Sequence, residues 1–226
     1  MKNTPLLTSR AYHYLETPQN ITTRLTSLLA LREKAGVPER PFIIWEPAPF
    51  SCLAVNLQSC LDAVRMVDVF SPNHLELAAL FGQSRPVVAD KDKIESQALR
   101  FLDSGVGLDG KGTVIVRAGE HGCVIMARAM SPIWLPPFYQ STPGDKPDAK
   151  VVDPTGAGNT FLGALAAGYL QTGSIVEAGC YGSVGASFAL EQVGMPEWSS
   201  DGEEELWNGA NVLARLCEYR KTIWTP

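Results

Sequence analysis

The sequence predicts an α/β protein with a mainly parallel sheet and helices on the faces of the sheet. Short apolar runs, each about the length of a buried strand, alternate along the chain with longer segments whose apolar residues recur at helical spacing. Glycine, proline or a helix-capping residue separates most of these segments. Because there is no evident internal linker, we expect one domain over residues 1–226, with residues 1–40 as an atypical N-terminal segment.

The first half of the chain gives most of the strand and helix signals. Residues 1–19 carry no clear periodicity and are expected to lie on the surface or to be only partly ordered. Asn20 or Thr22 is a candidate cap for a helix ending near Gly36. The further expected elements are a buried strand in PFIIWEP from Pro41, a helix over Val55–Arg65, a strand over Val67–Ser71, a helix beginning near Ser71 or Asn73 and ending at Gly82, and a polar helix over Asp92–Leu102.

The second half begins with two apolar runs, TVIVRAG and GCVIMAR, which are predicted to be paired strands or a hairpin. Residues Pro132–Lys150 are rich in proline and polar side chains and are expected to form a surface loop. A helix is predicted over Ser174–Glu191. DGEEELWNGANVLARLCEYRK is predicted to be an amphipathic terminal helix with acidic residues in its first turn, where they suit the helix dipole.

Composition excludes several classes of protein. A hydrophobic content of 45% and a charged content of 19% are ordinary for a soluble globular domain, and a net charge of −5 argues against a general binder of nucleic acid or anionic membrane. No run is apolar for long enough to span a bilayer. Five cysteines without a CxxC pair indicate free thiols in a reducing cytoplasm, and the three histidines show no metal-site spacing.

The stretch VVDPTGAGNTFLGALAAGYL, residues Val151–Leu170, is the strongest candidate for a binding site. Gly156 and Gly158 let the backbone approach a ligand, and the residues that follow are expected to form a helix. The start of a helix presents unpaired N–H groups and a positive dipole end, which suit an anion such as phosphate. The same residues also fit a tight turn before a closely packed helix, so this motif alone leaves both interpretations open.

A second candidate is the pair Asn73 and Glu76 in SPNHLE. Residues three apart share one face of a helix, so the amide and the carboxylate could together address a hydrated Mg²⁺ or a phosphate. The alternative is a helix cap followed by a solvated glutamate. A literal GxGxxG from Gly105 to Gly110 follows a helical segment and leads into a strand, which is the wrong context for dinucleotide binding. Neither a P-loop nor a GxSxG nucleophile elbow is present.

DPTGAGNTFLGALA resembles the C-terminal signature of the PfkB (ribokinase-like) family of sugar and nucleoside kinases. This resemblance implies a ribokinase-like three-layer α/β/α fold. It also implies that the amides of Gly156, Ala157 and Gly158 form an anion hole for the transferred phosphoryl group, with Asp153 and Thr155 shaping the nucleotide loop. In the family the next position is an aspartate, the base that accepts the proton of the acceptor hydroxyl. Here that position is Asn159.

Other segments resemble the family in the same order along the chain. Asn73 and Glu76 match its NxxE motif, which implies a role in organising Mg²⁺ and phosphate. VIVRAGEHG resembles a strand-loop-strand that lies against the nucleotide: Gly119 and Gly122 match, and Arg117 stands where threonine is common. An arginine there could pair with phosphate or be a solvated charge at a strand end. Ser183 falls near the adenine-contacting position. IIWEPAP, FSPNHLE and DPTGAGN resemble a fungal branch that includes the killer-maintenance proteins.

The departures from the family define the functional question. The N-terminal portion and the β lid of PfkB kinases are missing before Pro41, which predicts a truncated gene model or a reduced protein. An uncovered sheet edge then predicts pairing with a second copy or a protein partner. The resemblance implies ATP and Mg²⁺ as cofactors and transfer of the γ-phosphoryl group to a sugar-like hydroxyl. Asn159 has no useful basicity, which predicts a loss of about 10²–10⁴-fold in rate, or a non-catalytic module that binds nucleotide or a protein.

Overall fold

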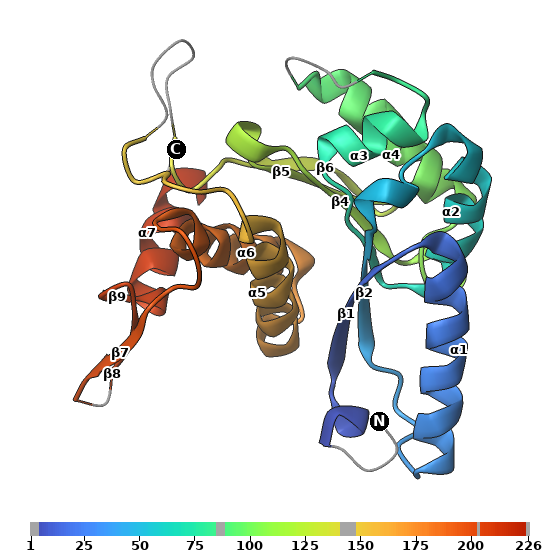
Figure 1. Cartoon of the computed structure of the whole chain (residues 1–226), viewed down its shortest axis with the longest axis horizontal. Helices are drawn as coiled ribbons and strands as arrows, with labels where there is room; N and C mark the ends of the chain where they lie inside the picture. Colours follow the sequence, from blue (N-terminus) through green and yellow to red (C-terminus); the bar gives the residue numbers. More distant parts are fainter. Residues whose placement is uncertain (1–4, 85–88, 141–147, 203, 225–226) are drawn as a thin grey trace. The chain divides into compact units, whose positions relative to one another are not determined.

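A computed structural model describes residues 5–84, 89–140, 148–202 and 204–224. Its largest feature is a six-stranded sheet in the order β1-β2-β3-β4-β5-β6 (Figure 1). The pairs β1–β2, β2–β3 and β3–β4 are parallel, so the predicted mainly parallel α/β sheet is confirmed. The strands are β1 (Ala11–Glu16), β2 (Phe42–Pro47), β3 (Val69–Phe70), β4 (Thr113–Arg117), β5 (Cys123–Ala127) and β6 (Met130–Leu135).

The chain divides into two compact units. Unit 1 comprises residues 1–118 and 124–133, and unit 2 comprises residues 119–123 and 134–226. No helix among the described residues is both long enough and apolar enough to cross a membrane. Short 3₁₀ helices connect the main elements at Pro5–Thr8, Pro49–Ser51, Ala54–Asn56, Val64–Met66, Leu108–Gly110 and Gly119–His121.

The described residues of unit 1 include four α-helices that follow from the predicted pattern. Because the parallel strands β1 to β4 lie in sequential order, right-handed crossovers place all the connecting helices on one face of the sheet, as Figure 1 shows. Strand β2 is buried along nearly its whole length, as expected for a strand inside a parallel sheet. The helices are α1 (Pro18–Lys34), α2 (Leu57–Ala63), α3 (His74–Leu80) and α4 (Lys91–Ser104).

The prediction for residues 1–19 was wrong, because Ala11–Glu16 form β1, which pairs in parallel with β2. The segment AYHYLE has no continuous apolar run, and five of its six residues are only half-buried, which is why the strand was missed. The register with β2 and the stacked rings of Tyr12 and Tyr14, whose centroids lie 6.2 Å apart, hold it in place. Helix α1 also begins earlier than predicted, since Thr17 accepts a hydrogen bond from Asn20 N and forms the cap.

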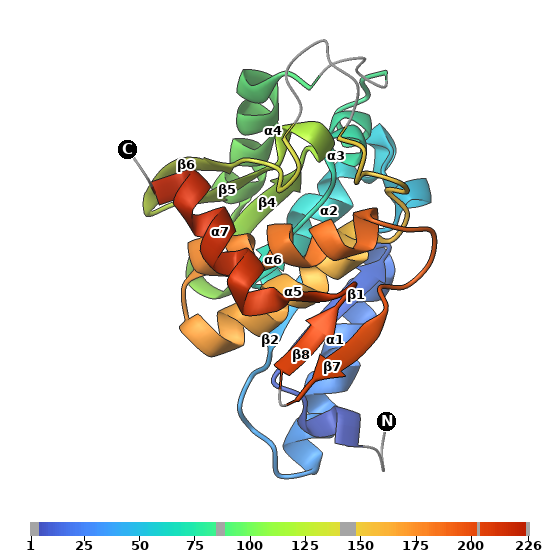
Figure 2. The ribbon, with the colours of Figure 1, turned by 90° about the vertical axis from the view of Figure 1, so that its left-hand side faces the viewer.

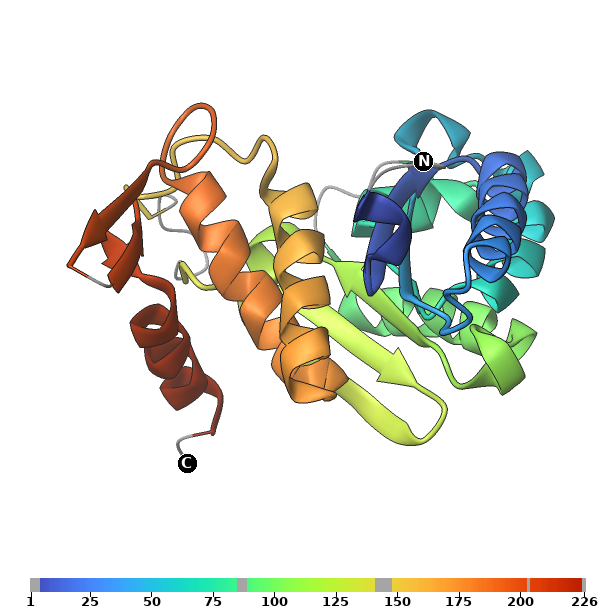
Figure 3. The same ribbon diagram turned by 90° about the horizontal axis from the view of Figure 1, so that it is seen from below.

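Within unit 2, the antiparallel helices α5 (Ala157–Thr172) and α6 (Ile175–Leu190) lie side by side (Figure 3). Glycines make this close approach possible. A Cβ atom on Gly182 would lie 2.8 Å from the Phe161 ring, and one on Gly185 would lie 2.5 Å from Ala164 Cβ. The sequence allowed a closely packed helix after the glycine turn. The contacts between α5 and α6 confirm this close packing.

The predicted terminal helix was wrong over about its first half. The structure has a small antiparallel sheet of β7 (Trp198–Asp201), β8 (Glu204–Trp207) and β9 (Ala210–Asn211) before α7 (Val212–Trp224), with no acidic residue in the first turn of α7 (Figure 2). Asn208 and Gly209 have φ values of 49° and 73° and form the turn between β8 and β9. An Asn-Gly pair with both residues at positive φ is a strong hairpin signal. The apolar residues of this segment also recur at helical spacing, so the hairpin signal was missed.

The predicted loop over Pro132–Lys150 was wrong at its start, because β6 extends to Leu135. Residues 141–147 lie outside the described part of the chain. The segment Val151–Asp153, which precedes the glycine turn, is not a strand. The N–H groups of Val152 and Asp153 instead donate to Leu190 O, at 2.7 and 3.2 Å, which ties this segment to the end of α6.

Candidate functional site

The glycine turn in unit 2 leads directly into α5. Asp153 Oδ1 accepts a hydrogen bond from Thr155 N at 2.9 Å, and this N–H lowers the pKa of the Asp153 carboxyl. Gly156 is the N-cap of α5 with a φ of +83°, and no side chain caps the helix. Ala157 N donates to Pro154 O at 3.2 Å, and the first helical hydrogen bond runs from Thr160 N to Gly156 O at 2.9 Å. The N–H groups of Gly158 and Asn159 precede that bond and have no partner within the helix.

The space around Gly156 is open. A Cβ atom placed there would meet nothing within 4 Å, in contrast to the glycines between α5 and α6. Thr155, Gly156 and Asn159 are all exposed. Close packing therefore does not explain Gly156. Its backbone conformation and open surroundings are what a loop needs if an anion is to reach the start of the helix.

The pair Asn73 and Glu76 in unit 1 forms a capping box at the start of α3. Asn73 Oδ1 accepts from Leu75 N at 2.9 Å and from Glu76 N at 2.8 Å, while Asn73 N donates to Glu76 Oε2 at 2.7 Å. The cap that the spacing suggested is therefore present. The glutamate is not solvated, however, because it is 7% exposed and burial raises the pKa of its carboxyl.

Arg117, at the end of β4, lies in the same unit and points into a buried charged cluster. Its Nη2 donates to Glu46 Oε1 at 2.6 Å and to Ser71 O at 3.0 Å, and it lies 3.7 Å from Glu76 Oε2. Glu46 Oε2 is 3.0 Å from His13 Nε2. Burial alone would raise the pKa of Glu46, but the hydrogen bond from His13 and the charge of Arg117 lower it.

Sequence reasoning missed Glu46 and His13. The signal for Glu46 was visible, because a carboxylate inside the apolar run PFIIWEP has to be paired if the strand is buried. His13 could not be found, since its position depends on the unpredicted pairing of β1 with β2. Arg117, predicted to be a phosphate partner or a solvated charge, is 12% exposed and held by carboxylate and carbonyl oxygens. A solvated charge is therefore excluded.

The other predicted residues lie in unit 2. Gly119 and Gly122 flank a 3₁₀ turn, both at positive φ. Ser183 is buried in α6, and its hydroxyl forms a hydrogen bond with Tyr219 on α7. Its contact with adenine stays a prediction.

The carboxylate of Glu76 and the chemistry around it determine how Mg²⁺ could be held. The described residues contain no group of three or more His, Cys, Asp or Glu side chains that could hold a metal ion by themselves. Both recorded interactions of Glu76 use Oε2, which leaves Oε1 as the oxygen that can face an ion. One carboxylate oxygen suits contact with hydrated Mg²⁺, which keeps several waters and takes its other ligands from phosphates. The residues therefore fit a nucleotide-borne Mg²⁺ rather than a protein cage.

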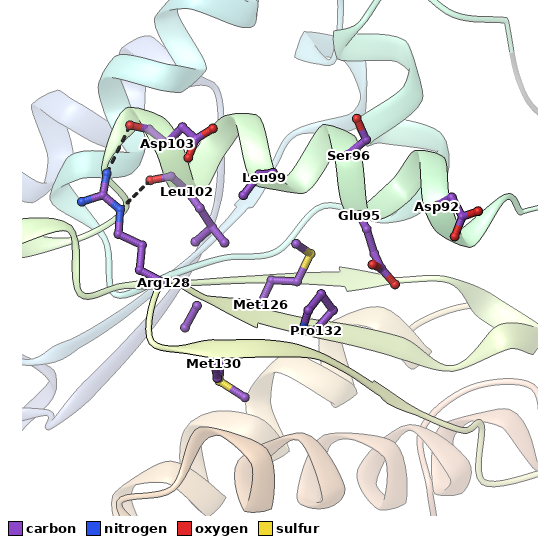
Figure 4. A pocket seen from close by; sticks show the side chains of 11 residues that line it. Asp92, Glu95, Ser96, Leu99, Leu102, Asp103, Met126, Arg128, Met130 and Pro132 are labelled. Atoms are coloured by element: carbon purple, nitrogen blue, oxygen red, sulfur yellow. Dashed lines mark hydrogen bonds between the residues drawn. The ribbon is translucent and has the colours of Figure 1, made fainter.

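A separate cavity of about 540 Å³ lies in unit 1 between α4 and the strands β5 and β6. Figure 4 shows Asp92, Glu95 and Leu99 on the helix, above Met126 and Pro132 on the strands. Arg128 closes one end by donating to the carbonyl oxygens of the last turns of α4. None of the motif residues lines this cavity, so it is distinct from the site described above.

Comparison with known proteins shows which family this chain belongs to. Residues 2–200 match the model of the pfkB family carbohydrate kinases. The chain belongs to this family. It is 34% identical over 229 residues to the Schizosaccharomyces pombe protein C16C9.01c, covering 96% of this chain and 61% of that protein. It is 30% identical to the protein MAK32 of Saccharomyces cerevisiae, covering 92% of this chain and 56% of the relative.

A solved structure of ribokinase from Arabidopsis thaliana, in complex with ribose and ATP, matches with a TM-score of 0.53 and 24% identity, over 76% of this chain and 47% of that one. This likeness supports the fold. The chain spans about 60% of the length of the curated relatives named above.

Proposed function

We propose that this chain binds Mg²⁺·ATP as a PfkB-type phosphotransferase does, and that transfer to a sugar-like alcohol is weakened by Asn159. The start of α5 receives the terminal phosphate through the amides of Gly156, Ala157 and Gly158. Asn73 and Glu76 organise Mg²⁺, and Asp153 and Thr155 shape the loop. The open turn at Gly156, with positive φ and no side-chain cap, is the observation that supports this function most strongly.

Several of these roles follow from chemistry as well as from the family. Phosphoryl transfer depends mainly on positioning and on stabilising charge, which backbone N–H groups at a helix start can supply. The Arabidopsis ribokinase was solved with ATP, which supports ATP as the nucleotide. Gly119, Gly122 and Ser183 are assigned to the nucleotide side of the site by position in the family. Arg117 stands at a family position on the same side, but its guanidinium donates to Glu46 and Ser71 O, so we do not assign it a contact with the nucleotide. Bound Mg²⁺ would screen the phosphate charge.

Asn159 determines how far the chemistry goes. A neutral amide cannot accept the proton of an attacking hydroxyl, and general-base catalysis is worth about 10²–10⁴-fold. We expect Asn159→Asp to raise the rate of phosphate transfer by up to this factor, measured as formation of ADP and of the phosphorylated product with a panel of sugars and inositols. Phosphate transfer by the wild-type chain would then be slow because a general base is absent, and not because nucleotide binding is weak.

The binding step is tested by a matched pair of glycines at the two ends of α5. Gly156 and Gly173 both have positive φ, of 83° and 68°, and open space around them. An alanine at either position costs about 1–2 kcal/mol of backbone strain. We expect Gly156→Ala to weaken Mg²⁺·ATP binding in a thermal-shift titration and Gly173→Ala to leave it unchanged, although both lower the melting temperature. Equal effects on binding, or no response of the wild type to nucleotide, would exclude an anion site at this turn.

A second candidate is a non-catalytic module that binds nucleotide or a protein partner, including a second copy of the chain. Asn159 favours it, since the base position lacks a carboxylate. Stabilisation by micromolar Mg²⁺·ATP without transfer in either the wild type or Asn159→Asp would support this candidate. A wild type that is insensitive to nucleotide and forms a stable dimer would favour the protein-interaction form.

A further inference from the structure

We propose that Glu46 is a positioning residue that holds the Arg117 guanidinium away from Glu76, and so keeps the Glu76 carboxylate available to a cation. This inference rests on the proposed function, in which Glu76 organises Mg²⁺. Glu46, Arg117 and Glu76 lie in unit 1 and come from β2, β4 and α3.

The distances from Arg117 show which of the two carboxylates its guanidinium contacts. Arg117 Nη2 is 2.6 Å from Glu46 Oε1 but 3.7 Å from Glu76 Oε2. The first distance is a strong charge-assisted hydrogen bond, whereas the second is too long for a hydrogen bond. The charge of Arg117 therefore stabilises the Glu76 carboxylate, but Arg117 forms no hydrogen bond with it.

The backbone around Arg117 fixes the same arrangement. Arg117 N donates to Pro72 O at 3.1 Å, and Nη2 also donates to Ser71 O at 3.0 Å, so the arginine is attached to the segment that leads into the Asn73 cap. Asn73 and Arg117 form an isolated parallel bridge. The backbone position of the arginine is thus set, and Glu46 is what determines the direction of its side chain.

Buried charges explain why removing Glu46 would redirect Arg117. The side chains of Glu46 and Glu76 are each 8% exposed and that of Arg117 is 12% exposed, so an arginine that loses its partner would remain buried and unpaired at high cost. Glu76 is the nearest alternative carboxylate. A direct pair between Arg117 and Glu76 would neutralise the carboxylate that is proposed to serve Mg²⁺ and would compete with Asn73 N for Oε2.

The experiment is a two-step mutant series on the whole chain. Glu46→Gln should raise the Mg²⁺ concentration needed for ATP to stabilise the protein by about 10–100-fold, the range typical for residues that orient metal ligands. Glu46→Gln combined with Arg117→Gln should recover most of this loss, because the competing cation is gone. A purely structural role predicts the opposite, since a second deletion in the same cluster would not restore Mg²⁺ dependence.

The control is another ion pair of unit 1. Arg40 Nη1 lies 2.6 Å from Asp68 Oδ2, and both side chains are about one-quarter exposed. Asp68→Asn should lower the melting temperature without changing the Mg²⁺ concentration at half-effect. If Asp68→Asn and Glu46→Gln shift the Mg²⁺ dependence equally, or if the double variant is no better than Glu46→Gln, Glu46 does not position the site.

Hydrogen exchange gives a readout that needs no nucleotide. Asn73 N–H is protected by Glu76 Oε2 at 2.7 Å. Its protection should fall in Glu46→Gln and return in the double variant, while amides of α1 remain unchanged. If the wild type does not respond to Mg²⁺·ATP but this pattern holds, the proposed function fails and the positioning role stands. Unchanged protection of Asn73 in Glu46→Gln would overturn the positioning role.

Discussion

Glycines in this chain serve different purposes that the sequence cannot distinguish. Gly156 has positive φ and an open environment, whereas Gly185 has no such φ and adjoins Ala164 of the neighbouring helix. The first fits a turn that a ligand approaches, and the second permits two helices to touch. Both stand among small residues in the sequence, so only the position of their neighbours separates the roles.

Gly122 and Gly119 provide a test of the same distinction. A Cβ atom on Gly122 would lie 2.0 Å from Leu135 O, whereas one on Gly119 would meet nothing within 4 Å. Both have positive φ, which costs about 1–2 kcal/mol for alanine. We expect Gly122→Ala to lower the free energy of unfolding by about 3 kcal/mol or more, since a backbone clash adds about 1–3 kcal/mol. Gly119→Ala should lower the free energy of unfolding only by the backbone strain at positive φ.

Chemical denaturation of the two variants measures this difference. Similar midpoints for Gly122→Ala and Gly119→Ala would contradict the close approach of Gly122 to the end of β6. Because both glycines are proposed to lie on the nucleotide side of the site, ATP titration of Gly119→Ala also reports whether that loop tolerates a side chain.

At the scale of elements, unit 2 is held by a cluster around Glu191 at the end of α6. Arg215 Nη2 lies 2.9 Å from Glu191 Oε1, Asn208 Nδ2 donates to Oε2 at 2.7 Å, and the Tyr139 hydroxyl also bonds to this carboxylate. These partners come from α7, from the turn between β8 and β9, and from the segment after β6. One side chain thus joins elements that are far apart in the sequence.

This cluster predicts a specific pH dependence. Burial alone would raise the pKa of Glu191, but the hydrogen bonds from Tyr139 and Asn208 and the charge of Arg215 lower it below its usual value. A carboxyl with a lowered folded-state pKa adds stability above its unfolded pKa of about 4.3, and this stability is lost as the pH falls through the folded pKa. Glu191→Gln should cost about 1–3 kcal/mol at pH 7 and much less at pH 3.

Urea denaturation at pH 7 and pH 3 measures the effect. Glu197, an exposed carboxylate nearby, provides the control: Glu197→Gln should change stability little at either pH. An equal loss for Glu191→Gln at both pH values would mean that packing, and not the ionised carboxylate, accounts for its contribution.

At the scale of the whole molecule, each unit buries its own thiols. Cys52 and Cys60 are buried in unit 1, Cys123 and Cys180 are buried in unit 2, and Cys217 on α7 is exposed. Burial raises the pKa of Cys52 and Cys60 to about 12 and that of Cys180 to about 11. Since the thiolate is the reactive form, these buried groups should be inert in the native protein.

We therefore expect one thiol to react rapidly with a disulfide reagent at pH 8. Cys217→Ser should abolish this rapid reaction. Mass spectrometry after partial denaturation should show Cys52 and Cys60 becoming reactive together, and Cys123 and Cys180 together, because each pair lies within one unit. Fast labelling of Cys60 in the native protein would contradict the described core of unit 1.

The pattern of apolar runs and glycine turns was enough to predict the α/β class, the parallel sheet and most helices, since buried strands and helices each impose their own spacing. The motifs around Asn73 and Gly156 indicated the kinase lineage, which the comparisons confirm. Strand β1 and the β7–β9 sheet were not predictable from spacing, because half-buried and exposed strands have no apolar pattern of their own and depend on their partners.

The sequence by itself determined the family, the capping of α3 and the glycine turn before α5, because each is encoded by residues that are neighbours along the chain. Tertiary structure alone decided that Glu46, Arg117 and Glu76 share one buried cluster and that Gly156 is open while Gly185 is packed. Those facts depend on residues up to 71 positions apart in sequence, and no local pattern specifies which of them meet.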